Sequence, residues 1–291
     1  MAATLVTALS FVLPKNAEKY LGELFWTRKT FAPPKYNVVL MGDSRVYRGL
    51  SPEIIESHLP DLKVLNFGYS NGGLNPTMFD AAEKKLAQND KAKIIVLGIS
   101  ANAITDFTAA NKQYQQELNR PREEIFERIY FNPLQYWFSA TSPEKLKKHF
   151  SKVEETSYYR NTYFMNGYVE SDKFPQDSME AVAYYINDYT NYKVTPEKLD
   201  ALFQQVKKWT STGIRVVGFV PPISQPMRNL EDSLGFFNET TIKAGFERAS
   251  GNWIDIESTQ YKTYDGSHLT IESAQKISHI IGKEVEKLVK N

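Results

Sequence analysis

Five short apolar runs, rich in β-branched residues, recur along the chain. They lie at residues 36–41, 63–67, 93–99, 214–220 and 253–256. Apolar runs that lack alternating polar positions are typical of strands buried on both faces of a parallel sheet. We therefore predict five strands that belong to one sheet.

Helical segments separate these runs. Four of them open with a capping residue followed by proline, the pattern of a helix start: Ser51-Pro52, Asn75-Pro76, Ser142-Pro143 and Thr195-Pro196. Apolar residues recur at helical spacing after Thr195, up to Gly213, and again after Thr270. Strands that alternate with helices predict an α/β fold with three layers, α/β/α, around a parallel sheet.

Residues 103–192 interrupt this alternation. The stretch follows the third predicted strand and carries many aromatic residues. We predict a helical, aromatic-rich cap insertion at about 103–192 within an α/β domain that spans 36–291. Its aromatic side chains either stack on sugars or form the core of the insertion itself, and the pattern leaves both alternatives open.

Residues 1–35 form an N-terminal segment and lead-in to this domain. Residues 2–14 carry no charge and are largely apolar. They are too few to span a bilayer, which takes roughly 20 residues, and no basic stretch of the signal-peptide kind precedes them. We expect either the remnant of a membrane anchor or export signal, or a helix that packs on the domain.

Composition narrows the function classes. The net charge is +1, from 35 basic and 34 acidic side chains, without the basic excess of a nucleic-acid binder. The absence of cysteine removes disulfides, thiolate metal sites and cysteine nucleophiles. The chain has four histidines, and we expect no multi-histidine metal centre. We expect no cofactor, no metal and no nucleic-acid partner.

Candidate chemistry stands at the two ends of the domain. Ser44 follows the first apolar run, and Asp265 precedes His268 by three positions. A serine hydroxyl becomes a nucleophile when a base takes its proton, and a histidine held by an aspartate is such a base. Gly68 and Ser100 follow the second and third runs, so these positions are expected to meet Ser44 at the carboxyl edge of the sheet.

Over residues 36–102 and 213–290 the chain resembles the SGNH (GDSL-type) hydrolase superfamily. The matching motifs are Gly42-Asp43-Ser44, Asn66-Phe67-Gly68-Tyr69-Ser70-Asn71-Gly72 and Asp265-Gly266-Ser267-His268-Leu269. The resemblance implies that Ser44 is the nucleophile, His268 the general base and Asp265 the residue that orients it. It also implies that the backbone amides of Ser44 and Gly68 donate hydrogen bonds to the oxyanion.

The third motif departs from the family pattern Gly-x-Asn-Asp. Here Gly98-Ile99-Ser100-Ala101-Asn102 has serine where the family has asparagine. Either Ser100 replaces that oxyanion donor, or Asn102 reaches in from a shifted loop. A similar departure occurs in divergent members that assist acylation of cell-envelope polymers, including relatives of teichoic-acid D-alanylation and alginate O-acetylation proteins. Those are often membrane-tethered and work with a membrane-bound O-acyltransferase.

The resemblance implies a serine esterase or O-acyltransferase that acts on acylated carbohydrate of the cell envelope or of an exported polymer. It further implies an extracytoplasmic location and a membrane-bound O-acyltransferase as partner. Two alternatives remain: a soluble hydrolase of small esters, and a non-catalytic binding or scaffolding subunit of a membrane acylation system.

Two further residues are candidates for substrate binding. Arg45 directly follows the nucleophile and is expected either to bind an anionic group of the substrate or to pair with a nearby carboxylate. Tyr264 precedes Asp265 and is expected to line the pocket.

Overall fold

The computed structural model describes residues 18–88, 92–138 and 156–290. Its main sheet contains five parallel strands in the order β2-β1-β3-β6-β7. These are β1 (Val38–Met41), β2 (Val64–Asn66), β3 (Ile94–Gly98), β6 (Arg215–Phe219) and β7 (Asn252–Trp253). The register places Val38 of the central strand β1 opposite Val64 and Ile94. The prediction of a parallel sheet is confirmed, with shorter strands than expected.

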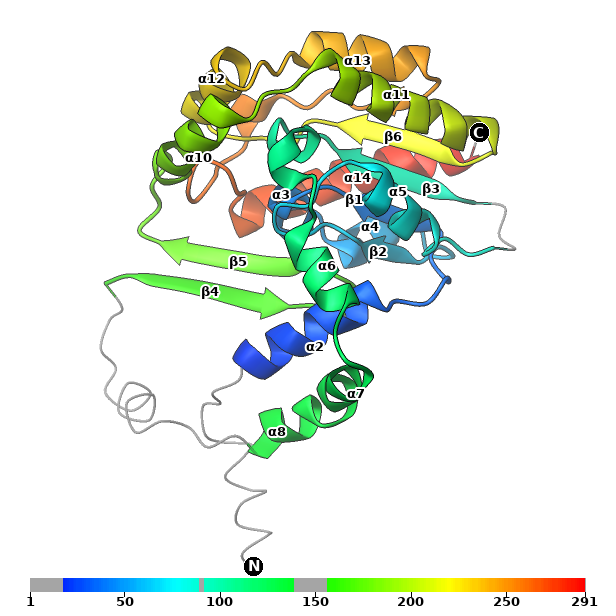
Figure 1. Cartoon of the computed structure of the whole chain (residues 1–291), viewed down its shortest axis with the longest axis vertical. Coiled ribbons are helices and arrows are strands. Elements are labelled where there is room, and N and C mark those ends of the chain that lie inside the picture. Colours follow the sequence, from blue (N-terminus) through cyan, green and yellow to red (C-terminus); the bar gives the residue numbers. More distant parts are fainter. Residues whose placement is uncertain (1–17, 89–91, 139–155, 291) are drawn as a thin grey trace, which may run out of the picture.

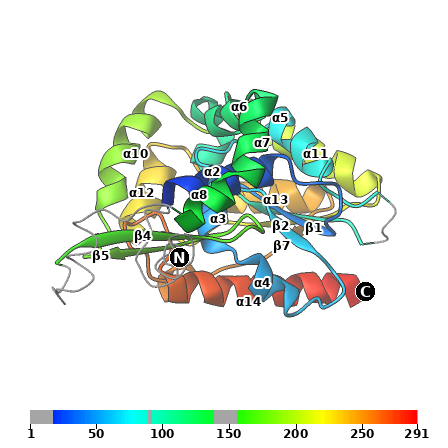
Figure 2. The same cartoon turned by 90° about the horizontal axis from the view of Figure 1, so that it is seen from below.

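Successive strand residues enter two different cores because side chains alternate across a sheet. Val39 and Met41 of β1 pack into the core beneath α5 (Pro76–Glu83), α11 (Pro196–Ser211) and α13 (Glu239–Arg248). Val38 and Leu40 pack into the other core, beneath α4 (Pro52–Glu56) and α14 (Ile271–Lys290). Figure 2 shows α14 and α4 on one side of the strands and α5 and α11 on the other. The sheet therefore lies between two layers of helices.

The capping signals act largely as expected. The Ser51 hydroxyl accepts a hydrogen bond from the amide of Ile54 at 3.5 Å, and the Asn75 side chain accepts one from the amide of Met78 at 3.4 Å. Thr195 precedes α11 without a side-chain cap bond. Ser142-Pro143 lies outside the described residues.

The insertion differs from the prediction, because it is helical only in part. It contains short turns at Asn102–Ile104 (η1) and Asp106–Thr108 (η2) and helices α6 (Lys112–Leu118), α7 (Arg122–Tyr130), α8 (Asn132–Phe138) and α10 (Glu180–Asn191). Between α8 and α10 it also contains an antiparallel hairpin, β4 (Tyr158–Tyr163) and β5 (Val169–Phe174). A turn with Gly167 at a φ of +93° joins the two strands, a conformation that favours glycine.

The hairpin packs against the domain at the end where the N-terminal helix lies (Figure 1). Strand β4 contacts α2 (Glu18–Thr30), and β5 contacts α3 (Ser44–Gly49) and α14. The ammonium group of Lys29 in α2 donates a hydrogen bond to the carbonyl of Gly167 at 2.9 Å. The amide of Asn66 at the end of β2 donates to the carbonyl of Asn166 at 2.9 Å.

The aromatic residues of the insertion are in part buried in the core and in part exposed. Tyr168 and Tyr189 are buried, whereas Tyr130 and Phe131 are exposed. Residues 2–14 lie outside the described residues. Among the helices that the structure describes, none combines the length and the apolar character needed to cross a membrane.

Candidate active site

Ser44 stands at the sharp turn between β1 and α3. Gly42 has a φ of +152°, and a side-chain carbon at this position would lie 2.7 Å from the carbonyl oxygen of Gly98. The carboxylate of Asp43 caps α3 by accepting a hydrogen bond from the amide of Arg45 at 2.9 Å. Ser44 is the first helical residue and is partly exposed. The turn thus presents its hydroxyl at the carboxyl edge of the sheet.

The structure brings Ser44, His268 and Asp265 into one hydrogen-bonded chain. The Oγ of Ser44 lies 2.8 Å from Nε2 of His268, across 224 positions of sequence. Nδ1 of the same imidazole lies 2.7 Å from Oδ2 of Asp265. The side chains of His268 and Asp265 are 15% and 14% exposed, so the chain lies near the surface.

The loop that carries the acid and the base is held from several sides. Oδ1 of Asp265 accepts the amides of Ser267 at 2.9 Å and His268 at 2.8 Å. The amide of Ala181 in α10 donates to the carbonyl of Asp265 at 2.9 Å, and the amide of Ser224 donates to that of Gly266 at 2.9 Å. The carboxylate therefore approaches the imidazole from a fixed direction.

Asp265 is ionised at neutral pH. Burial raises its pKa, but the hydrogen bond and charge of His268, together with the two loop amides, outweigh burial and lower the pKa to about 2. A carboxylate only accepts hydrogen bonds, so Nδ1 of His268 carries the proton in this pair. In the neutral form of this tautomer Nε2 is the acceptor and faces the Ser44 hydroxyl, which is the arrangement that a general base requires.

Tyr264 covers one face of His268. The two rings lie nearly parallel, at 14°, with centroids 5.6 Å apart. The tyrosine is 2% exposed, and burial raises the pKa of its hydroxyl while Arg48 opposes that rise. The expectation that Tyr264 lines an open pocket is therefore not met. Its ring packs against the imidazole instead.

Of the two roles expected for Arg45, the structure shows the pairing with a carboxylate and not the binding of a substrate anion. Its Nη2 lies 2.6 Å from Oε1 of Glu231 in α12 (Gln225–Ser233), and its Nε donates to the hydroxyl of Ser267 at 3.0 Å. Burial lowers the pKa of Arg45, but Glu231 and neighbouring groups raise it well above its usual value. This guanidinium joins α12 to both segments of the triad and does not face solvent, so it is not available to a substrate.

Ser100 was one of the two side chains expected to donate a hydrogen bond to the oxyanion. Its hydroxyl donates to Oδ2 of Asp43 at 2.5 Å and accepts the amide of Ala103 at 3.2 Å. A hydroxyl has one proton to donate, and here that proton binds the cap of α3. Ser100 therefore has no donor left for an oxyanion.

Asn102 is the remaining polar side chain of the third motif. It is 1% exposed, and neither its amide nitrogen nor its amide oxygen has a hydrogen-bond partner among the described residues. A buried polar group without a partner carries a cost in stability, and each such group needs an explanation. Of the two alternatives left open by the sequence, Asn102 is the one with a free donor.

In the second motif, the backbone amide expected to bind the oxyanion already has a partner inside the protein. The amide of Gly68 donates to Oδ1 of Asn66 at 3.0 Å, so it is already engaged. Among the described residues, the amides of Ser44 and Asn71 have no such partner. Asn71 has a φ of +48°, which asparagine tolerates better than most residues. The Ser70-Asn71-Gly72 sequence was the signal for this turn.

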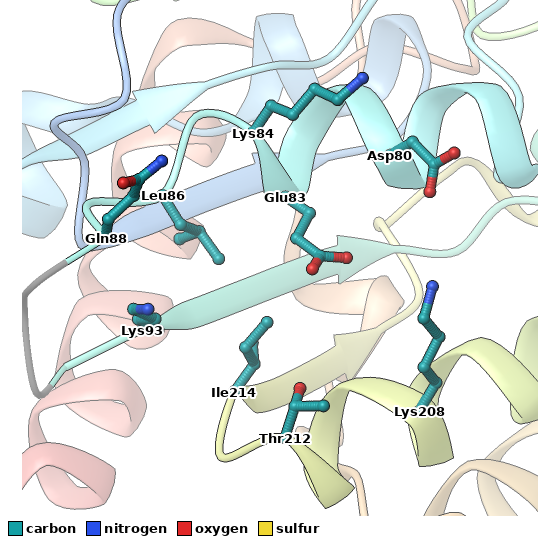
Figure 3. A pocket seen from close by; sticks show the side chains of 9 residues that line it. All are labelled: Asp80, Glu83, Lys84, Leu86, Gln88, Lys93, Lys208, Thr212 and Ile214. Atoms are coloured by element: carbon teal, nitrogen blue, oxygen red, sulfur yellow. The ribbon is translucent and has the colours of Figure 1, made fainter.

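The structure also contains a cavity near the amino ends of β3 and β6, at the opposite ends of the strands from Ser44. Its volume is about 450 Å³, and its lining includes Lys93 just before β3 and Ile214 just before β6. Figure 3 shows charged side chains of α5 and α11 around it. It opens at the amino edge of the sheet, whereas Ser44 stands at the carboxyl edge.

In the described part of the chain, no group of three histidine or acidic side chains is placed to hold a metal ion.

No protein-family model and no curated protein sequence matches the chain. Among solved structures it is similar to one described as "a putative platelet activating factor from Streptococcus pneumonia". The sequence identity is 12%, the TM-score is 0.41, and the match covers 97% of this chain and 99% of that chain. A likeness at that TM-score supports no conclusion about function.

Proposed function

We propose that the protein is an SGNH-type serine enzyme that cleaves or transfers ester-linked acyl groups. One observation carries the proposal: the unbroken hydrogen-bonded chain from Ser44 Oγ through His268 to Asp265, with distances of 2.8 and 2.7 Å. Nucleophile, base and orienting acid in this geometry are the parts of covalent acyl transfer. The motif resemblance supports the same activity.

The reaction has two steps. His268 Nε2 takes the proton of Ser44, and Oγ attacks the acyl carbonyl carbon. When the bond to the alcohol oxygen breaks, the leaving alcohol receives that proton from His268, and the acyl group remains on Ser44. Water or a sugar hydroxyl then gives its proton to His268 and attacks the acyl carbon, and the proton returns to Ser44 as it leaves.

The oxyanion formed in each step needs hydrogen-bond donors. The amide of Ser44, the amide of Asn71 and the side chain of Asn102 are the candidates, since each has an unused donor. Removing one such donor typically costs about 2.7–4 kcal/mol of transition-state stabilisation. Our proposal therefore replaces Gly68 and Ser100 by Asn71 and Asn102.

For the substrate we propose acylated carbohydrate of the cell envelope or of an exported polymer, with an extracytoplasmic location and a membrane-bound O-acyltransferase as partner. The resemblance of the motifs to envelope-acylation proteins and the apolar character of residues 2–14 support this choice. Acetyl transfer to oligosaccharides, compared with hydrolysis of short aryl acetates, separates it from a hydrolase of small esters.

A non-catalytic scaffolding role is the second candidate. The engagement of Ser100 by Asp43 favours it, because the third motif then lacks its usual donor. Exposure to a fluorophosphonate probe, followed by intact-protein mass, tests both. We expect one covalent adduct in the wild type and none in Ser44→Ala or His268→Ala. The matched control is Ser57→Ala, since Ser57 is an exposed serine at the C-terminal end of α4. This variant should form the adduct as the wild type does. A folded wild type without an adduct would leave the scaffolding role.

A further inference from the structure

Arg48 lies on the same face of α3 as the nucleophile. It follows Ser44 by four positions, and residues at this spacing are neighbours on a helix surface. Its Nη1 donates to the hydroxyl of Tyr264 at 3.0 Å, and the ring of Tyr264 stacks on His268. Through these contacts the guanidinium is held beside the base of the triad.

Every acceptor around Arg48 is neutral. Nη1 contacts the hydroxyl of Ser171 at 2.9 Å, the amide oxygen of Asn161 at 3.4 Å and the hydroxyl of Tyr159, and Nε donates to the hydroxyl of Tyr47 at 3.0 Å. In the described ranges, no carboxylate lies within ion-pair distance of this guanidinium.

Other shielded arginines of the protein do meet carboxylates. Arg45 pairs with Glu231, and Arg120 and Arg128 both pair with Glu117. A cation held in a half-buried place without an opposite charge is costly, and arginine stays protonated there. Among the described residues, no negative charge therefore balances the positive charge of Arg48.

Part of the guanidinium is available to a ligand. Nη2 has no hydrogen-bond partner among the described residues, and it is not among the polar atoms that are sealed from solvent without a partner. Its two N–H donors suit the oxygens of a carboxylate or phosphate, which guanidinium groups bind with charge-assisted hydrogen bonds.

We propose that Arg48 binds an oxyanion group of the substrate, a carboxylate or a phosphate carried by the alcohol part of the ester. This inference rests on the proposed function and names its substrate class: acyl esters of acidic alcohols, such as sugars that carry a carboxylate or a phosphate. The anion supplies the missing opposite charge and places the scissile ester against Ser44. Under this proposal Arg48, four positions after Ser44, binds the anionic group of the substrate, a role that the sequence suggested for Arg45.

The test compares two esters of similar shape, one charged and one neutral. Acetate release is measured from 3-acetoxybenzoate, which is anionic, and from 3-acetoxybenzamide, which is neutral and of similar shape. The quantity of interest is the ratio of kcat/KM for the acid over the amide. We expect Arg48→Gln to lower this ratio by about tenfold or more, the range of a lost hydrogen bond to a charged group. A third substrate, 3-acetoxyphenyl phosphate, distinguishes phosphate from carboxylate as the preferred anion.

Three variants separate charge recognition from hairpin anchoring, which Arg48 also performs. Ser171→Ala removes an anchor but keeps the cation, and Arg160→Gln removes a cation from the opposite face of β4. Both should keep the wild-type ratio, and Arg48→Lys should retain more of it than Arg48→Gln. An unchanged ratio in Arg48→Gln, or an equal fall in Ser171→Ala, overturns the inference.

A binding measurement keeps the inference distinct from the proposed function. A wild type that releases no acetate and takes no fluorophosphonate adduct contradicts the proposed function. Calorimetric titration with 3-hydroxybenzoate and with inorganic phosphate then decides about Arg48. Binding by the wild type that weakens about tenfold or more in Arg48→Gln supports the anion site, whereas equal binding, or none by the wild type, rejects it.

Discussion

The guanidinium of Arg45 and the carboxylate of Glu231 lie 2.6 Å apart with their side chains 1% and 0% exposed. Arg45 directly follows Ser44, and its Nε donates to the hydroxyl of Ser267, which stands between Asp265 and His268. One buried ion pair thus connects α12 with both segments that form the triad. The hydrogen-bonded chain of Ser44, His268 and Asp265 is therefore joined to α12 by a contact outside the chain itself.

Breaking this pair should destabilise the fold. Glu231→Gln and Arg45→Met should each lower the free energy of unfolding by about 3–5 kcal/mol, because each leaves the other charge buried without its partner. The double variant should lose less than the sum of the two. Urea denaturation measures all three values. Lys243→Met breaks an exposed pair with Asp255 and serves as control, with no measurable loss expected. A small loss in Glu231→Gln would contradict the role of the pair.

Asp265→Asn should remove most of the activity while leaving the protein folded. An asparagine oxygen cannot hold the protonated Nδ1 tautomer of His268 as the carboxylate does, and this change lowers kcat by about 10⁴-fold in a Ser-His-Asp triad. Ester turnover measures the loss, and the rate of fluorophosphonate labelling should fall with it. Asp172→Asn, a change on β5, is the control and should leave both rates near wild type. Turnover retained by Asp265→Asn would place the base elsewhere.

The stabilising contribution of Asp265 should disappear at low pH. Its pKa is about 2 in the folded state against an ordinary value of 3.8. A carboxyl group with a lowered folded-state pKa stabilises the fold above its unfolded pKa, and this stabilisation is lost as the pH falls through the folded pKa. The difference of nearly two units corresponds to about 2 kcal/mol. Denaturation of the wild type and Asp265→Asn at pH 6 and pH 2.5 should show the gap between them shrink. A constant gap would refute this linkage.

Asn102 and Ser100 should respond differently to replacement by alanine. Asn102→Ala should lower kcat by about 10²–10³-fold with little change in KM, as expected for an oxyanion donor, and should not reduce stability. Ser100→Ala should instead lower the free energy of unfolding by about 2 kcal/mol or more, since it leaves the buried Asp43 carboxylate short of a donor. Kinetics and denaturation on both variants make the comparison. A stability loss in Asn102→Ala without a fall in kcat would assign it a packing role.

Local signals in the sequence were enough for the sheet and for the placement of the triad. The apolar runs mark the strands, because a strand buried on both faces tolerates few polar residues. Ser44 and Gly68 follow two neighbouring strands, and parallel topology brings such positions to one edge. His268 carries its orienting acid three positions before it, so that pair needed no long-range information.

Contacts between distant segments decided what the sequence left open. Arg45 is paired with Glu231 and Ser100 with Asp43, and neither pairing follows from the spacing of residues along the chain.

The hairpin, by contrast, does have a local signal in the sequence that predicts its turn. Asn166-Gly167 is the dipeptide most typical of tight hairpin turns, and it stands between two segments with aromatic residues at their ends.

Ser44 and His268 are separated by 224 positions of sequence, yet Ser44 Oγ and His268 Nε2 lie 2.8 Å apart. During synthesis, His268 is added only after all five strands of the main sheet, the last of which ends at Trp253. An incompletely translated chain has Ser44 after β1 but lacks His268, so the ester chemistry that we propose would begin only after the entire domain has folded. Reactivity of Ser44 toward a covalent probe accordingly reports on completed folding of the chain.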